Sequence, residues 1–129
     1  MLATDWTMLD PALPKDLVIA VYAISGLFDL VPLVETSINK ALGLDQDAAK
    51  AASPLFWTPP VHGSLDAVVG EAESTEYFRQ SRTIVEAWGA AGVAAEFGTV
   101  AGANHFTAIA PLADPDSGMV KRLKQLARR

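Results

Sequence analysis

One histidine and two glutamates occupy positions from which they could act together in acid–base chemistry. His105 lies in the segment GANHF (102–106) and is one of only two histidines in the chain. Glu71 and Glu73 lie in the segment GEAES (70–74). A carboxylate that accepts the Nδ1 proton of an imidazole fixes the tautomer of the ring and stabilises the imidazolium ion. These residue types suit a histidine general base that one of the two glutamates orients.

The segments that must position these residues alternate between strand and helix patterns. Continuous apolar, β-branched sequence predicts a buried strand over 17–25, and two further strands are predicted over 65–70 and 93–101. Cap residues, glycine stops and helical spacing of apolar residues predict helices over 36–44, 45–53, 74–92 and 117–129. This alternation favours an α/β fold with a mainly parallel sheet of about three strands and flanking helices.

The expected topology brings the glutamates and the histidine to one edge of the sheet. GEAES follows the second predicted strand, and GANHF follows the third. Right-handed crossovers place the loops that follow parallel strands on the same side, where ligands bind in open α/β sheets. We therefore expect one of the two carboxylates to lie within hydrogen-bond reach of the His105 ring.

The chain resembles the C-terminal half of an α/β-hydrolase and, more narrowly, the arylformamidases (kynurenine formamidases) and related esterases. The matching segments are AISGLFDLVPL, SINKALGLD, SPL, VVGEAESTEYFRQS and GANHF. The resemblance implies that Glu73 is the triad acid and His105 the triad histidine, with Glu71 as the competing acid. The family usually has aspartate at the acid position, and glutamate has a longer arm.

The serine of such a triad has no counterpart here. No serine of the chain lies in a Gly-x-Ser-x-Gly elbow, and no His-Gly-Gly oxyanion segment is present. We therefore expect residues 1–129 to be a single partial α/β-hydrolase domain that begins downstream of the nucleophile. Ser25 and Asp29, in the segment SGLFD, are expected to shape a turn and a pocket wall rather than to perform chemistry.

The resemblance implies a serine hydrolase that acts on an ester or an N-formyl amide, with no organic cofactor and no metal. This chain would supply the triad acid and histidine, and alone it would be inactive. The apolar strand over 17–25 would have an unpaired edge that seeks an N-terminal fragment or a second copy of the chain. The alternative is a non-catalytic α/β module that pairs through this edge.

Composition narrows the remaining functions. The formal net charge is −5, which disfavours nucleic-acid binding, and the basic cluster KRLKQLARR suits the C-terminal end of a helix. No membrane span or signal peptide is expected, and the absence of cysteine suits a reducing cytoplasm. His62 is expected in a surface loop. Three aromatic residues could either line a substrate pocket or pack in the core: Phe28, Phe56 and Trp57.

Overall fold

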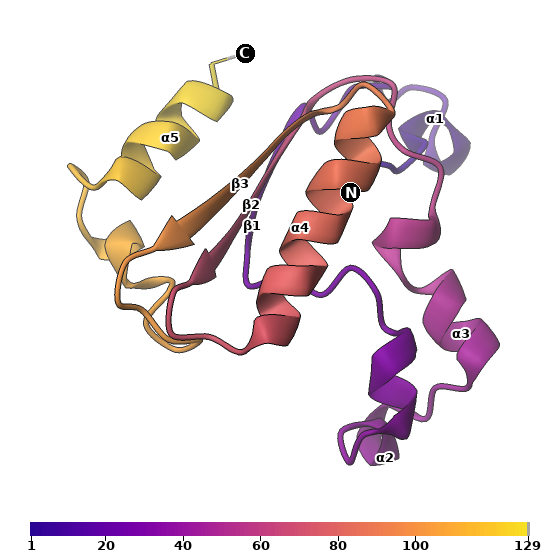
Figure 1. Cartoon of the computed structure of the whole chain (residues 1–129). Coiled ribbons are helices and arrows are strands. Elements are labelled where there is room, and N and C mark those ends of the chain that lie inside the picture. Colours follow the sequence, from indigo (N-terminus) through magenta and orange to yellow (C-terminus); the bar gives the residue numbers. More distant parts are fainter. Residues whose placement is uncertain (129) are drawn as a thin grey trace.

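Three parallel strands form the centre of the structure, a computed structural model that describes residues 1–128 (Figure 1). The strands are β1 (Ala20–Ile24), β2 (Ser64–Gly70) and β3 (Ala94–Val100). Their order in the sheet is β1-β2-β3, and both pairings are parallel. The prediction of a mainly parallel sheet of about three strands is confirmed.

The first strand is shorter than the predicted 17–25. The chain turns at Gly63, whose φ is +90°, so β2 begins only at Ser64, which lies opposite Ala20 and donates its N–H to the Ile19 carbonyl over 3.1 Å. At the other end Ser25 adopts a left-handed backbone with a φ of 51°, which ends β1. The strand therefore ends where the backbone geometry changes, although the apolar sequence extends further on the N-terminal side.

Helices cover both faces of the sheet (Figure 1). Helix α4 (Thr75–Ala90) packs on β2 and β3, while α5 (Gly118–Leu126) lies across the opposite face and contacts β1. Ser74 is the N-cap residue of α4 and Ser117 caps α5 through its hydroxyl. The last residue of the predicted terminal helix, Arg129, lies outside the described residues.

Short helical segments join β1 to β2. These are α2 (Asn39–Leu42) and α3 (Gln46–Ala51), with 3₁₀ turns at Val31–Glu35 and Pro54–Phe56; α1 (Trp6–Leu9) precedes β1. The helix predicted over 36–44 is wrong in length, since only four residues are helical. The Asn39 side chain forms hydrogen bonds with the backbone of Val34 and Leu44, and Gly43 ends the helix with a φ of 64°.

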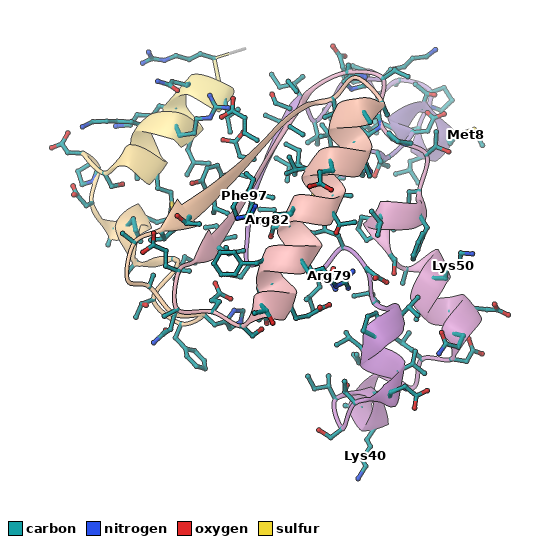
Figure 2. All side chains as sticks on the ribbon, viewed as in Figure 1. Met8, Lys40, Lys50, Arg79, Arg82 and Phe97 are labelled. Atoms are coloured by element: carbon teal, nitrogen blue, oxygen red, sulfur yellow. The ribbon has the colours of Figure 1, made fainter. Side chains whose placement is uncertain are left out.

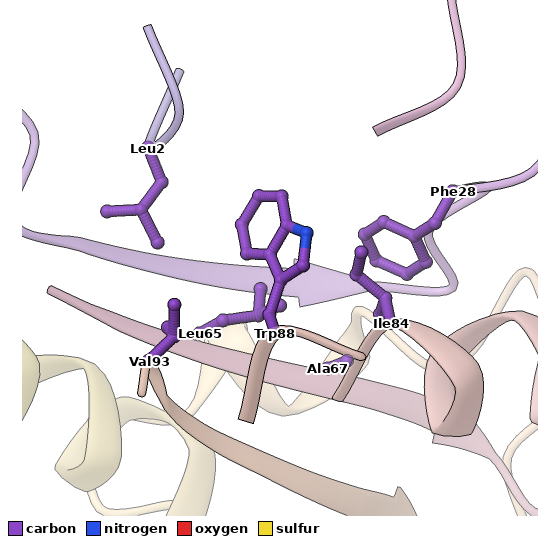
Figure 3. Packing of buried hydrophobic residues seen from close by; sticks show 7 residues of the cluster. All are labelled: Leu2, Phe28, Leu65, Ala67, Ile84, Trp88 and Val93. Carbon is purple, nitrogen blue, oxygen red and sulfur yellow. The ribbon is translucent and has the colours of Figure 1, made fainter. Parts of the chain in front are cut away.

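The main hydrophobic core lies between α4 and the sheet (Figure 3). Ile84 and Trp88 project from α4 onto the strands, where Leu65 and Ala67 of β2 are almost fully buried. The buried cluster consists of Leu2, Phe28, Leu65, Ala67, Ile84, Trp88 and Val93. Phe28 is thus a core residue, whereas Phe56 and Trp57 keep 47% and 40% of their surface exposed.

Candidate active site

The ends of all three strands meet at one site. Ser25 follows β1, Glu73 lies in the turn between β2 and α4, and His105 lies in the loop after β3. Because the strands are parallel, these three loops all leave the sheet at the carboxyl ends of the strands, to which the strand arrows point in Figure 1. The predicted meeting of the glutamate and histidine loops is confirmed.

Glu73 and His105 are in direct contact. The Oε2 atom of Glu73 lies 3.0 Å from Nδ1 of His105. The Glu73 side chain is completely buried, whereas the His105 side chain keeps 49% of its surface exposed. The pair therefore places a sheltered carboxylate behind an imidazole that is open to solvent, which is the relation between the acid and the base of a hydrolase triad. The catalytic role of the two residues remains a prediction.

The second carboxylate oxygen of Glu73 accepts two hydrogen bonds. The Ser25 hydroxyl donates to Oε1 over 2.5 Å, and the backbone N–H of Gly70 donates to the same atom over 2.8 Å. Burial by itself raises the pKa of the Glu73 carboxyl, but the bonds from Ser25, Gly70 and His105 outweigh it and bring this pKa below its ordinary value. Glu73 is therefore ionised at neutral pH.

Glu71 has a different set of partners. Its carboxylate accepts from the backbone N–H of Gly102 over 3.1 Å and contacts the Thr99 hydroxyl at 3.3 Å. It thus braces the start of the loop that carries His105, and Glu73 rather than Glu71 faces the imidazole. Of the two acids that the sequence left open, the geometry favours Glu73 for the acid position.

The loop after β3 is held in place on both sides of His105. The Asn104 side chain accepts from the backbone N–H groups of Phe106 and Thr107, and the Ala103 carbonyl accepts from Ala72 N–H over 2.9 Å. Gly70 permits this approach, because a Cβ there would lie only 2.3 Å from the Ala103 oxygen. These contacts fix the distance between the acid turn and the histidine loop.

An aromatic ring supports the imidazole from α4. The Tyr77 ring stacks on the His105 ring with centroids 4.8 Å apart and planes at 27°. Phe106 meets the other side of His105 edge-on, at 5.8 Å. The ring orientation of His105 is therefore set by Glu73 and by two aromatic neighbours that the sequence analysis did not single out.

The segment after Ser25 is tied to α4 by a buried amide. The Gln80 Oε1 atom accepts from the backbone N–H groups of Phe28 and Asp29, and its Nε2 donates to the Asp29 carbonyl. Arg79, labelled at the lower half of α4 in Figure 2, adds an ion pair with the Asp29 carboxylate at 3.0 Å. Asp29 shapes this turn, as predicted, whereas Gln80 was missed.

Gln80 could have been found from spacing. It lies four residues before Ile84 and eight before Trp88, on the face of α4 that packs on the sheet. An amide at such a position, only 2% exposed, must find hydrogen-bond partners inside the fold.

The described residues 1–128 were also compared with the requirements of a metal site and of a membrane span. No three His, Cys, Asp or Glu side chains in this range gather where they could hold a metal ion. Nor is any helix in it both long and apolar enough to cross a membrane. His62 is half-buried in the loop before β2, far in sequence from His105 and at the other end of the strand.

Because the pKa of Glu73 is lowered in the folded state, we expect the free energy of unfolding to depend on pH. Because the folded-state pKa lies below the ordinary value of 4.5, ionised Glu73 stabilises the fold above that pH, and the contribution is lost as pH falls through the lowered pKa. A Glu73→Gln variant should be about 1–3 kcal/mol less stable at pH 7, since buried donors lose a charged acceptor.

Urea unfolding of the wild type and of Glu73→Gln at pH 7 and at pH 3 measures this difference. The gap between their free energies of unfolding should be largest at pH 7 and should narrow towards pH 3. Glu71→Gln, at an exposed carboxylate of the same turn, is the matched control. A gap for Glu73→Gln that stays constant from pH 7 to pH 3 would contradict the assigned hydrogen bonds.

Comparisons with known proteins find hydrolases that are similar to this chain. No protein-family model matches the chain. It is 28% identical over 131 residues to kynurenine formamidase of Danio rerio and 26% identical over 132 residues to that of Salmo salar. Both alignments cover 98% of this chain but 44% of the relative, so the chain spans less than half the length of these curated relatives.

Solved structures give the same picture. A protein from Silicibacter sp. TM1040 to which a thioesterase function has been ascribed is 37% identical, with a TM-score of 0.75, over 88% of this chain and 43% of that one. Esterase 2 of Thermogutta terrifontis, phosphonylated by cyclosarin, is 22% identical with a TM-score of 0.57, over 91% of this chain and 42% of the esterase. The second likeness concerns the fold alone.

Proposed function

We propose that this chain, whose fold is that of the C-terminal part of an α/β-hydrolase, supplies the acid and the histidine of a serine-hydrolase triad. The observation that carries the proposal is the contact between buried Glu73 and half-exposed His105 at the ends of neighbouring parallel strands. The order of the two residues, acid before histidine, is the chain order of α/β-hydrolases. The two relatives named kynurenine formamidase support the same reaction class.

The ring of His105 is arranged to act as general base through Nε2. Because ionised Glu73 can only accept hydrogen bonds, Nδ1 must carry the proton, and this leaves Nε2 as an acceptor. Nε2 takes the proton of an attacking serine hydroxyl as the serine oxygen bonds to the substrate carbonyl. It then returns that proton to the leaving alcohol or amine, and Glu73 stabilises the imidazolium between the two steps.

The substrate class follows from the relatives. We propose an ester or an N-formyl amide, with N-formylkynurenine and small aryl esters as the candidates, because two of the relatives are named kynurenine formamidase. The mechanism uses no organic cofactor and no metal, and we propose that the reaction takes place in the cytoplasm. The exposed aromatic residues Phe56 and Trp57 and the ring of Phe106 are available to a ligand.

The nucleophile must come from a further part of the hydrolase fold, and the β1 edge is where that part would dock. β1 pairs with β2 on one side, and its five residues are all half-buried. An apolar hollow of about 350 Å³ lies between this strand and α5, lined by residues such as Leu17, Ile19 and Leu123. On the opposite face of the sheet, which α4 covers, the buried Nε1 of Trp88 has no hydrogen-bond partner within residues 1–128.

A chimaera tests the proposed function. In it, this chain replaces the segment of the Silicibacter protein with which it aligns, so that the remainder of that protein supplies the rest of the fold. The folded chimaera should hydrolyse p-nitrophenyl acetate or N-formylkynurenine. A chimaera that melts cooperatively but hydrolyses neither these substrates nor an acyl thioester would contradict the proposal.

A second candidate is a non-catalytic module that pairs through β1, and the unpaired edge of that strand favours it. The wild-type chain should then form dimers or larger species at micromolar concentration, as measured by light scattering. A Val18→Lys, Val21→Lys variant, with one lysine in β1 and one two residues before it, should stay monomeric, because lysine at the edge of a sheet opposes pairing. A monodisperse wild-type monomer that melts cooperatively would contradict this module and would also show that β1 needs no cover.

A further inference from the structure

We propose that Ser25 is a positioning residue, which holds the Glu73 carboxylate in the orientation that presents one oxygen to His105. This inference rests on the proposed function, and it assigns a role to a serine that sequence analysis placed only in a turn. Three independent features carry it: the backbone of Ser25, the division of hydrogen bonds on Glu73, and the anchoring of the segment that follows.

The backbone of Ser25 is unusual. Among the described residues it is the one non-glycine residue with a positive φ, at 51°. Side chains other than glycine, asparagine and aspartate rarely adopt this conformation, and residues held in it cluster at functional sites. The Ser25 N–H donates to the Val68 carbonyl over 2.8 Å, which ties it to β2 just before the chain turns away. The left-handed turn aims the hydroxyl at the neighbouring strand end.

The two oxygens of Glu73 have separate tasks. Oε1 accepts from the Ser25 hydroxyl at 2.5 Å and from Gly70 N–H at 2.8 Å, whereas Oε2 faces His105 Nδ1 at 3.0 Å. Two donors from different strands prevent the carboxylate from rotating about its last bond. Because glutamate has one more rotatable bond than the aspartate usual in this family, it gains more from such a restraint.

The same contacts argue against Ser25 as the nucleophile. Its hydroxyl donates to one oxygen of Glu73 while the other oxygen contacts the imidazole, so His105 is not placed to take the proton of Ser25. The following segment is fixed by Gln80, which bonds to the backbone of Phe28 and Asp29. Removal of the hydroxyl should therefore leave the turn in place.

The test is Ser25→Gly, because glycine adopts the positive φ without strain and removes the hydroxymethyl side chain that contacts Glu73. In the 129-residue chain, ¹⁵N NMR of the imidazole measures the fraction of His105 that carries its proton on Nδ1. This fraction should fall in Ser25→Gly and stay at the wild-type value in Ser37→Gly, an exposed serine in the turn before α2. The readout needs no enzymatic activity, so it holds even if the chimaera is inactive.

In the active chimaera, Ser25→Gly should lower kcat by about 10- to 100-fold and leave KM within about 2-fold, since misplaced catalytic groups cost rate rather than binding. An unchanged tautomer fraction together with an unchanged kcat would overturn the proposal. So would a serine-directed phosphonate adduct found on Ser25 of the unmutated chimaera, because that result would make Ser25 the nucleophile. A tautomer change in an inactive chimaera supports the positioning role and counts against the proposed function alone.

Discussion

Replacement of His105 by alanine in the chimaera should lower kcat/KM for an aryl ester by about 10³- to 10⁵-fold, which is the order of loss seen when a triad base is removed. In the proposed mechanism the imidazole moves a proton between the nucleophile and the leaving group, and its Nδ1 atom contacts Glu73. Steady-state kinetics of purified chimaera and variant measure the effect.

His62→Ala is the matched control for this loss. His62 is the second histidine of the chain, and it lies in the loop before β2, at the opposite end of the strand from the site. Its removal should change kcat/KM by less than about 3-fold, in line with surface substitutions away from a site. Residual activity of His105→Ala within about 10-fold of the parent would show that another residue is the base.

Glu73 offers a graded comparison at the same site. Glu73→Gln would leave His105 with a neutral partner, whereas Glu73→Asp would keep the charge on a shorter side chain. The contacts at Oε1 are made by Ser25 and Gly70, whose positions suit the longer side chain. These two contacts are thus made at the end of the longer glutamate side chain.

The sequence predicted the parts of the site that depend on topology. Once the segments 65–70 and 93–101 are strands of a parallel sheet, the loops that carry Glu73 and His105 must lie at one edge. This order and the resemblance to a hydrolase predicted that Glu73 or Glu71 would meet His105, and the structure places Glu73 there, 3.0 Å from the ring. Local patterns also predicted a helix over 74–92 with Ser74 or Thr75 as its cap, and in the structure Ser74 is the N-cap residue of α4.

The sequence did not predict the residues that hold the acid in place. Ser25 contacts a side chain 48 residues away, and Gln80 bonds to backbone groups 51 and 52 residues away. Such contacts depend on the register between β1 and β2 and on the rotation of α4, which residue spacing constrains only loosely. The positive φ of Ser25 was also hidden, because serine carries no local preference for that conformation.

The predicted length of the first strand, 17–25, was wrong for a related reason. The apolar sequence from Leu17 onwards suits a strand, but a strand exists only where a partner offers hydrogen bonds, and β2 begins opposite Ala20. The apolar residues before it instead line the hollow beside α5. Their sequence is explained if a further part of a hydrolase fold covers them, which is the arrangement that the proposed function requires.

The 129-residue chain alone should not hydrolyse aryl esters above the rate of the buffer. Under the proposed function it would lack a nucleophile, because no serine lies in a Gly-x-Ser-x-Gly elbow and the Ser25 hydroxyl is bonded to Glu73. In a model hydrolase, removal of the whole triad costs about 10⁶-fold in kcat, and what remains comes from the oxyanion hole and substrate binding. The expected signal from this chain is therefore no higher than background.

A serine-directed phosphonate tests this prediction independently of turnover. The chimaera should be labelled stoichiometrically on a serine outside the segment supplied by this chain, and the isolated chain should remain unlabelled at the same probe concentration. Mass spectrometry of tryptic peptides locates the adduct. Hydrolysis by the pure chain could instead titrate with the phosphonate and leave the adduct on Ser25. That result would make Ser25 the nucleophile. It would overturn its positioning role beside Glu73 and the need for a second part of the fold. Hydrolysis that does not titrate, and that persists in His105→Ala, would instead identify a contaminant.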